Sequence, residues 1–239
     1  MTDDMKKMIH DVVNSVSELD YVHPEDIPNI PLYMDQVTTF MDEQLDRCKR
    51  YEDDKILTKT MINNYAKNQL LPAPEKKKYS KEHVVLMTLI YYFKNILSIK
   101  DIETLLQPLT DKYFKNEDGL DMSEIYEEMC KIEKSRLGSL QRDVVKSYRI
   151  ARESFTDAPE DEQDDLQLFT FIGNLIFDVY VKKQIIERLI DQLPKAEEEN
   201  QKSAKNKACT GLIFLLILSF LQKPYHTHRS RNLRTGSPG

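Results

Sequence analysis

The sequence predicts a mainly α-helical protein with two parts, an N-terminal helical domain and a C-terminal helical bundle or dimerisation region. Apolar residues recur at helical spacing in most segments, as Met61, Ile62 and Tyr65 do. Only 6 of the 239 residues are glycine, which argues against a turn-rich all-β fold. Charged residues make up 31% of the chain and hydrophobic residues 40%. This composition is typical of a globular protein with long exposed helical faces.

The first 45 residues predict two helices joined by an extended connector. Residues 1–25 hold a short amphipathic helix over residues 5–17, with apolar residues on one side. Three prolines in Tyr21–Pro31 predict an extended connector. The next helix is expected over Tyr33–Leu45, and its apolar face is expected to pack against the helix that follows.

A polar helix is predicted after Thr58, whose hydroxyl is suited to cap its first turn. Met61, Ile62 and Tyr65 form its apolar side. The opposite side is rich in amides and lysines, and its members are Lys59, Thr60, Asn63, Asn64 and Lys67. Amides pair with adenine edges, and lysines contact phosphate or guanine. This side, with Thr58 at its start, is therefore a candidate DNA-reading surface.

Positive charge is concentrated around this helix. Residues 55–81 hold seven lysines and one glutamate, a net charge of +6, so the rest of the chain sums to −12. The segment Pro72–Lys78 predicts a small wing or extended loop. The lysines in and after it are Lys76, Lys77, Lys78 and Lys81. A basic cluster in an acidic chain indicates a polyanion site, and the alternative is a cluster that only aids solubility.

Two further helices are predicted to complete this domain. Ser80 caps an apolar helix that runs through Asn95, and His83 in its first turn is expected to be a surface or capping group. The next helix begins at a capping box made by Ser98 and Asp101. We expect Pro108 to end it after Leu106.

The segment Met61–Pro72 resembles the recognition helix of MerR-type winged helix-turn-helix regulators. The helix after the wing is also similar, through Tyr79, Glu82, Val84 and Leu86. Residues 26–108 more closely resemble a bacterial family known as domain of unknown function 1836, through the segments Pro31–Val37 and Lys77–His83. The MerR resemblance implies a winged helix-turn-helix domain that binds DNA.

The sequence departs from the MerR pattern at three places. Asn63 stands where that pattern has arginine, which weakens a phosphate contact at that position. Gln69 stands where a glycine makes the turn, so we expect a reshaped exit from the helix. Eleven residues, Asp46–Ile56, separate the two helices, whereas a compact motif has a turn of about three or four. Either the helices extend into this gap or the motif is opened out.

After a linker at residues 109–122, residues 123–193 form a second helical region. Two helices are expected over Ser123–Lys134 and Leu137–Phe155, with a break near Gly138. The acidic stretch Asp157–Asp165 is expected to be a solvated loop. Its alternative is a metal site, but it lacks the glycine and final glutamate of a calcium loop.

The helix predicted over Leu166–Leu193 has more apolar positions than one face can hold. We therefore expect a homodimer whose interface includes Leu175, Val179, Ile186 and Leu189. The MerR resemblance also implies dimerisation through the C-terminal region. Residues 194–239 are expected to be a polar linker, an apolar segment and a disordered basic tail. The apolar run Leu212–Leu221 is shorter than the roughly twenty residues that span a bilayer, so docking on the bundle is expected and membrane tethering is the alternative.

Several classes of function are excluded by the pattern of residues. The chain has no glycine-rich nucleotide-binding motif, no cysteine spacing for a metal, and no grouped nucleophile and base. Cys48, Cys130 and Cys209 are far apart and odd in number, which fits a reducing cytoplasm. We therefore expect a cytoplasmic, non-enzymatic regulator of transcription that binds double-stranded DNA without a cofactor or metal. The alternatives are a helical adaptor for protein partners and a membrane-tethered regulator, and no small-molecule effector is identified.

Overall fold

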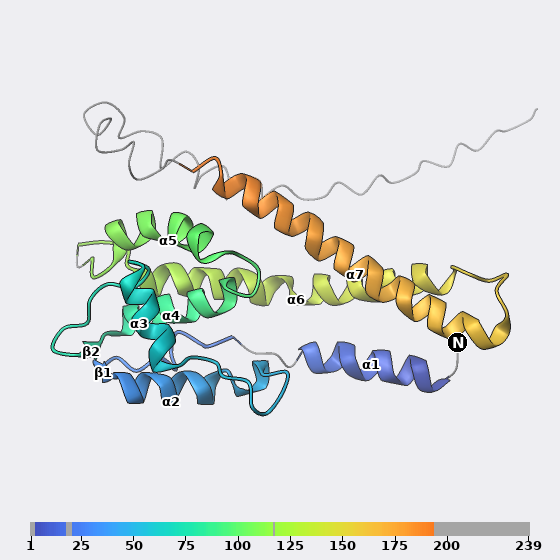
Figure 1. The fold of residues 1–239 in the computed structure, drawn as a ribbon, viewed down its shortest axis with the longest axis horizontal. Coiled ribbons are helices and arrows are strands. Elements are labelled where there is room, and N and C mark those ends of the chain that lie inside the picture. Colours follow the sequence, from blue (N-terminus) through green and yellow to red (C-terminus); the bar gives the residue numbers. More distant parts are fainter. Residues whose placement is uncertain (1–2, 18–20, 117, 194–239) are drawn as a thin grey trace, which may run out of the picture. The chain divides into compact units, whose positions relative to one another are not determined.

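The computed structural model of the protein describes residues 3–17, 21–116 and 118–193. The elements are α1 (Asp3–Ser17), β1 (Leu32–Tyr33), α2 (Met34–Gln44), a 3₁₀ helix (Asp46–Cys48), α3 (Lys59–Lys67), β2 (Lys78–Tyr79), α4 (Lys81–Phe93), α5 (Ile99–Tyr113), α6 (Met122–Arg152) and α7 (Glu160–Ile190) (Figure 1). The predicted mainly helical class is confirmed. Among the described helices, none has an apolar stretch long enough to cross a bilayer. The expectations for Cys209 and for Leu212–Leu221 lie outside the described residues.

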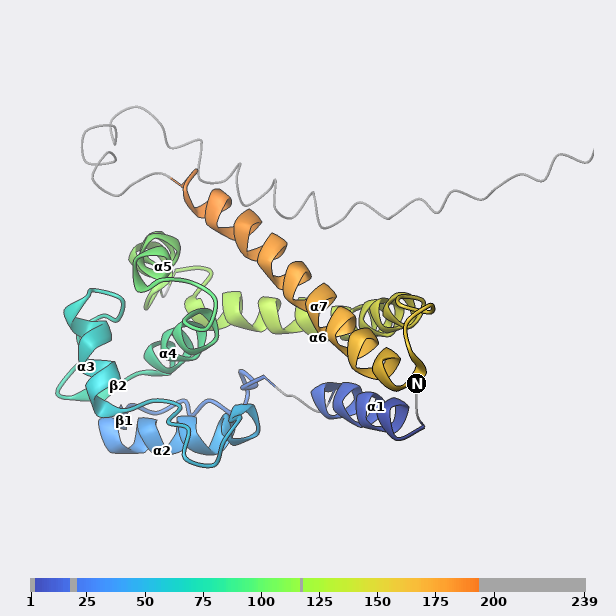
Figure 2. The same cartoon turned by 45° about the vertical axis from the view of Figure 1, so that its right-hand side comes forward.

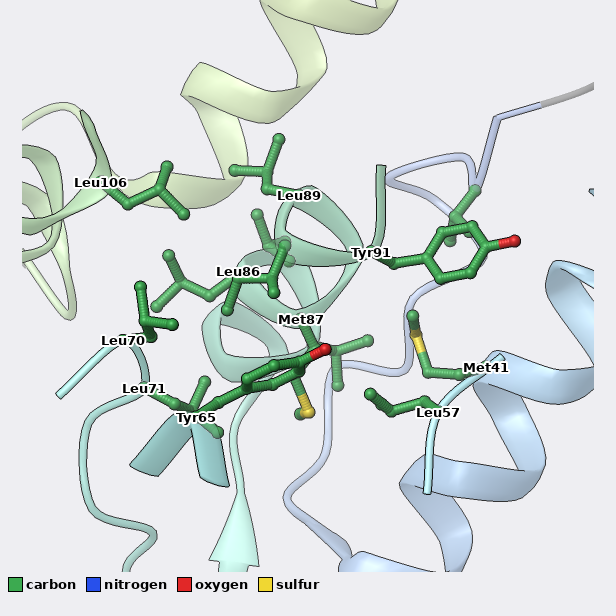
Figure 3. Packing of buried hydrophobic residues seen from close by; sticks show 14 of the residues in the cluster. Met41, Leu57, Tyr65, Leu70, Leu71, Leu86, Met87, Leu89, Tyr91 and Leu106 are labelled. Carbon is green, nitrogen blue, oxygen red and sulfur yellow. The ribbon is translucent and has the colours of Figure 1, made fainter. Parts of the chain in front are cut away.

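Helix α4 forms the centre of the larger hydrophobic core. Every residue from Glu82 to Tyr91 is buried, so this helix is enclosed on all sides. Figure 3 shows Leu86 and Met87 in the middle of this core, with side chains of α2, α3 and α5 around them. Met122, Tyr126 and Ile190 also belong to it, so α6 and the end of α7 complete the core that the first half of the chain begins. The most apolar predicted helix is therefore the central one.

A two-stranded antiparallel sheet joins the start of α2 to the end of the loop after α3. Leu32 pairs with Tyr79, and Tyr33 pairs with Lys78. Leu32 and Tyr79 are buried, which anchors both strands to the core. The sheet therefore fixes the lysine-rich loop beside the first turn of α2 (Figure 2).

The connection between α2 and α3 is opened out and packed on the core. It covers residues 45–58 and contains the 3₁₀ helix. Leu45, Ile56 and Leu57 are buried, and Lys94 Nζ donates a hydrogen bond to the Ile56 carbonyl at 3.1 Å. The sequence left two possibilities, that the helices extend into this gap or that the motif is opened out. The structure shows the opened-out motif, because α2 ends at Gln44 and α3 begins at Lys59.

Helix α5 does not end before Pro108, so that prediction is wrong. The helix continues through Pro108 to Tyr113. A proline inside a helix costs about 3 kcal/mol because one backbone hydrogen bond is lost and the ring crowds the preceding turn. Thr110 is buried beyond it, and Leu109 and Tyr113 pack against the core. Burial of this last turn offsets the cost of the proline, whose own ring is exposed.

Helix α6 is continuous, so the predicted break near Gly138 is also wrong. Asp121 caps its first turn, because its carboxylate accepts a hydrogen bond from the Glu124 backbone N–H at 2.8 Å, and the helix runs for 31 residues. Met122 and Tyr126 pack in the larger core at one end, whereas Val144 packs in a second cluster further along. Glycine disfavours a helix because its backbone loses more conformational entropy than that of other residues. The contacts at both ends of α6 offset this cost at Gly138.

Replacing Gly138 with alanine should stabilise the protein by about 0.5–1 kcal/mol, because alanine loses less backbone entropy in a helix. The nearest atom to a Cβ at this position is Arg142 Nη1 at 3.6 Å, an ordinary contact. Urea denaturation of both proteins measures the change. Replacing Gly173 in α7 with alanine is a matched control. A Cβ there meets nothing within 4 Å, so this variant should gain a similar free energy of unfolding. Loss of stability in the Gly138 variant would contradict a continuous α6.

The second hydrophobic cluster joins α1, α6 and α7. Its buried members are Ile9, Ala151 and Phe171, and the Tyr148 ring lies edge-on to Phe171 at 5.5 Å between centroids. Helix α7 begins at Glu160, so the predicted acidic loop is wrong for residues 160–165, whose acids lie in the first turns of the helix. Carboxylates at a helix N-terminus interact favourably with the helix dipole. In the described chain, no three His, Cys, Asp or Glu side chains gather as metal ligands would.

Candidate nucleic-acid interface

Helix α3 has the two faces that its sequence predicts. Thr58 caps it, because its hydroxyl accepts a hydrogen bond from the Met61 backbone N–H at 3.2 Å. Ile62 and Tyr65 are buried in the core. The polar residues on the other side are all exposed, and they are Lys59, Thr60, Asn63, Asn64 and Lys67. The predicted amide and lysine surface is therefore solvent-accessible along the whole helix.

The exit from α3 keeps the left-handed turn that a glycine would make, so the expected reshaping does not occur. Gln69 has a φ of 57°. Leu70 N–H donates to the Tyr65 carbonyl at 2.9 Å, and Gln69 N–H donates to the Ala66 carbonyl at 3.2 Å. These two bonds form a Schellman cap, in which buried Leu70 packs near the last turn of the helix. The cap tolerates glutamine at the cost of a strained backbone conformation.

The lysines of the predicted wing lie on a tight two-residue turn, Glu75–Lys78, which we call the lysine turn. Lys76 and Lys77 both have positive φ, 50° and 64°, and Lys78 N–H donates to the Glu75 carbonyl at 2.8 Å. This is the arrangement of a type I′ turn, which favours Asn-Gly at the two central positions. Lysine in the left-handed region costs on the order of 1 kcal/mol per residue. The fold therefore holds two exposed lysines in place at an energetic cost.

The first turn of α2 is where α3 and the lysine turn meet. Lys59 at the start of α3 forms an ion pair with Asp35. Lys78 Nζ lies 5.0 Å from the centroid of the Tyr33 ring, a cation–π contact. The Tyr33 backbone N–H donates to Gln36 Oε1 at 2.8 Å, which caps α2. Tyr33 is 53% exposed, so an accessible aromatic ring lies between the two basic elements.

Tyr33, Asp35 and Gln36 were not among the site residues predicted from sequence. The contact of Asp35 with Lys59 and that of Tyr33 with Lys78 join positions that are 24 and 45 residues apart in the chain. The one local signal was the spacing of Tyr33 and Gln36, which suits a capping pair at the start of a helix.

Besides Lys59, which pairs with Asp35, two further lysines near the site lie close to acids within the chain. Lys115 forms an ion pair with Glu75, and its hydrogen bond and charge lower the pKa of that carboxyl. Lys81 is partly buried at the start of α4. The pKa of the Glu127 carboxyl on α6 is lowered mainly by Lys131 and to a smaller extent by the charge of Lys81. Lys81 therefore lies near the Glu127 carboxyl of α6, whereas Lys76 and Lys77 are exposed and form no ion pair among the described residues.

His83 is a capping group, as expected, but it is buried and not on the surface. Its Nδ1 accepts a hydrogen bond from the Ser80 backbone N–H at 2.9 Å. The ring lies edge-on to Tyr79 and Phe114, with centroids 5.5 Å and 4.8 Å away. Its Nε2 makes no hydrogen bond within the described residues. The side chain thus ties the end of the lysine-rich loop to the first turn of α4.

The pKa of His83 is lowered to about 4, first by burial and next by the charge of Lys115. The folded protein therefore holds this ring neutral, whereas the unfolded chain binds a proton near pH 6.5. Stability from this group is fully present above about pH 6.5 and is lost as pH falls towards 4, by on the order of 3 kcal/mol.

Replacing His83 with glutamine should remove this part of the pH dependence. Glutamine at the third helical position preserves the capping box but does not titrate. Urea unfolding of both proteins at several pH values between 7.5 and 4.5 measures the difference. We expect the wild type to lose stability more steeply than the variant on acidification. Parallel profiles would show that His83 does not stay neutral in the folded state.

Residues 22–129 match a protein family described as a domain of unknown function (DUF1836). The matched range contains α2, α3, the lysine turn, α4 and α5, and it extends into α6. It is longer than the range 26–108 expected from the sequence. Comparison with curated proteins and with solved structures gave no match. The part of the chain that carries the candidate interface is therefore similar to the DUF1836 family.

Proposed function

We propose that this protein binds double-stranded DNA and regulates transcription, with α3 in the major groove. The observation that supports this most is the exposed polar face of α3, whose five side chains include two amides and two lysines and no acid. A helix of nine residues is about 13 Å long and fits across a major groove about 12 Å wide. Asn63, Asn64 and Thr60 are proposed to contact base edges.

The lysine turn is proposed to contact phosphates beside that groove. Lys76 and Lys77 are exposed at its tip, and the short sheet holds it next to the start of α2. Lys59 and Lys67 would add contacts at the two ends of α3. The order of helix, helix, basic turn and helix resembles the winged helix-turn-helix arrangement of the MerR regulators, with an opened connection between the first two helices. Phosphate contacts of this kind position a protein on DNA, whereas base contacts give it sequence preference.

Dimerisation through α7 is proposed as part of this function. Leu175 and Ile186 of the predicted interface are partly buried against their own chain, whereas Val179 and Leu189 are exposed. Val179 also belongs to an exposed row with spacing three, four and three, which we call the α7 seam: Phe169, Ile172, Ile176 and Val179. That spacing is typical of a helix that packs against another helix. We therefore place the proposed dimer contact on the α7 seam.

The same apolar surface favours a second candidate function, a non-enzymatic adaptor. A second exposed row runs along α7, made of Phe177, Val181, Ile185 and Leu189. Exposed apolar rows of this kind on a helix are normally covered by a partner. An adaptor would use these rows to bind another protein and would show no affinity for DNA.

Changing Asn63 and Asn64 together to alanine tests the base-reading role. The variant should lose about 1–3 kcal/mol of binding free energy at the preferred DNA site. Its affinity for unrelated duplexes should barely change, because phosphate contacts supply that affinity. Both values come from fluorescence anisotropy with duplexes selected from random sequence. Both side chains are exposed, so folding should be unaffected. Equal loss on all duplexes would argue against base reading.

A further inference from the structure

An apolar cavity of about 640 Å³ lies where α1, α6 and α7 meet the edge of the larger core. Met8 and Val12 of α1 form one wall, and Leu140 of α6 and Phe171 of α7 form others. Tyr21 also lines it, and its ring lies edge-on to Tyr92 at 5.6 Å between centroids. Figures 1 and 2 both show α1 running beside α6 and the first half of α7. The cavity is distinct from the α3 surface and from the lysine turn.

Among the residues that the structure describes, no charged side chain lines the cavity. Its fifteen lining residues are aliphatic or aromatic except for a few neutral polar groups, among them the Cys48 thiol and the Gln141 amide. Burial raises the pKa of Cys48 and of Tyr21, which keeps both groups neutral. The Tyr92 hydroxyl, also in the lining, accepts a hydrogen bond from the Val22 backbone N–H at 3.1 Å. A charged molecule would find no counter-ion among these lining residues, and burying an unpaired charge is strongly unfavourable.

The size and the exposure of the walls indicate what would fill this space. Ligand pockets for small organic molecules have volumes of about 300–1,000 Å³. Ordered water needs several polar partners, and most of these walls offer none. Met8 and Val12 are 44% and 56% exposed, which is high for apolar side chains that face a cavity. An apolar molecule between α1 and α7 would cover both.

We infer that this cavity binds an uncharged, mainly apolar small molecule, with the Gln141 amide available for one hydrogen bond. The occupant would pack between α1 and the helices α6 and α7 and would stabilise the docking of α1. This inference does not depend on DNA binding, because none of the cavity residues lies on α3 or on the lysine turn.

The test is a fluorescence titration of the full chain with N-phenyl-1-naphthylamine, an uncharged apolar probe. We expect a saturable isotherm with one probe per chain. Changing Val144 to phenylalanine or, in a separate variant, Val12 to tryptophan should fill the cavity and weaken binding at least tenfold. Val12 is more than half exposed, so its variant should fold even if the Val144 variant does not. Circular dichroism and thermal melting check both variants.

A matched control separates the cavity from the exposed surface of α7. Phe177 and Val181 are exposed and do not line the cavity, so changing both to serine should leave probe affinity unchanged. Loss of binding in this control would overturn the inference, as would unchanged binding in a folded cavity variant. The sulfonated analogue 8-anilinonaphthalene-1-sulfonate should bind at least tenfold more weakly, and equal affinity would overturn the uncharged ligand class.

A remaining outcome concerns the chain's own apolar segment. If the full chain binds the probe only after Phe214 and Ile217 are both changed to aspartate, then residues 208–221 fill the cavity themselves. That result would overturn the inference of a small-molecule site. Probe binding by the unchanged full chain supports it.

Discussion

Changing Lys76, Lys77 and Lys78 together to glutamate should reduce affinity for double-stranded DNA by about 100-fold or more at 0.1 M salt. Each lysine that neutralises a phosphate releases counter-ions and contributes a factor approaching ten at that salt concentration. Lys76 and Lys77 are exposed at the tip of the lysine turn, so the change removes contacts and adds repulsion without disturbing the core. Fluorescence anisotropy with a labelled duplex measures the loss.

A second variant separates this effect from misfolding. Changing Lys76 to asparagine and Lys77 to glycine gives the two residues that a type I′ turn favours. It should raise the free energy of unfolding by about 1 kcal/mol or more, because two strained left-handed conformations are relieved. The slope of log affinity against log salt should become shallower by about 2, since two phosphate contacts are lost. A more stable protein with unchanged DNA affinity would exclude the lysine turn from the interface.

Aspartate at Phe169 and Ile176 should convert a dimer into monomers. Both side chains are exposed in the single chain, 74% and 61%, so the monomer should keep its fold. In the proposed dimer the new charges would be buried without partners, which costs several kcal/mol and should weaken association by at least about 100-fold. Sedimentation velocity measures the change. A protein concentration of roughly tens of micromolar is suitable, because a dimer with a micromolar Kd is then largely associated.

The matched control for this result uses the other apolar row of α7. Aspartate at Phe177 and Val181 should leave the dimer intact, because neither residue belongs to the α7 seam. Dissociation by both pairs would move the contact to a wider surface of α7. A wild-type chain that sediments as a monomer would contradict dimerisation and favour the adaptor function.

Much of the fold was predictable because strong local signals agree with the final packing. The apolar run at Val84–Tyr91 predicts the central helix, and Thr58 and Ser98 cap their helices as expected. The predicted helix end before Pro108 and the predicted break near Gly138 were wrong for the same reason. Each residue disfavours a helix locally by a few kcal/mol at most, and packing further along the helix exceeds that cost. Such tertiary contacts are not visible in a local reading of the sequence.

The candidate site was predicted in composition but not in geometry. The polar face of α3 follows from helical spacing alone, so Asn63 and Asn64 were identified correctly as exposed. The left-handed conformations of Lys76 and Lys77 were not foreseen, since neither glycine nor asparagine marks that turn. Tyr33 was missed because its role depends on strand pairing with Lys78, far along the chain. Long-range pairing decides which basic residues share one surface.

The most direct test of the central claim is the salt dependence of duplex binding by the full chain. Anisotropy titrations at 50, 100 and 200 mM salt, on duplexes selected from random sequence, give the slope of log affinity against log salt. Four lysines are exposed on α3 and at the tip of the lysine turn: Lys59, Lys67, Lys76 and Lys77. We expect a slope of about −3.6, because each of these four phosphate contacts contributes roughly −0.9. The absence of salt-sensitive affinity for any duplex would contradict DNA binding through this surface.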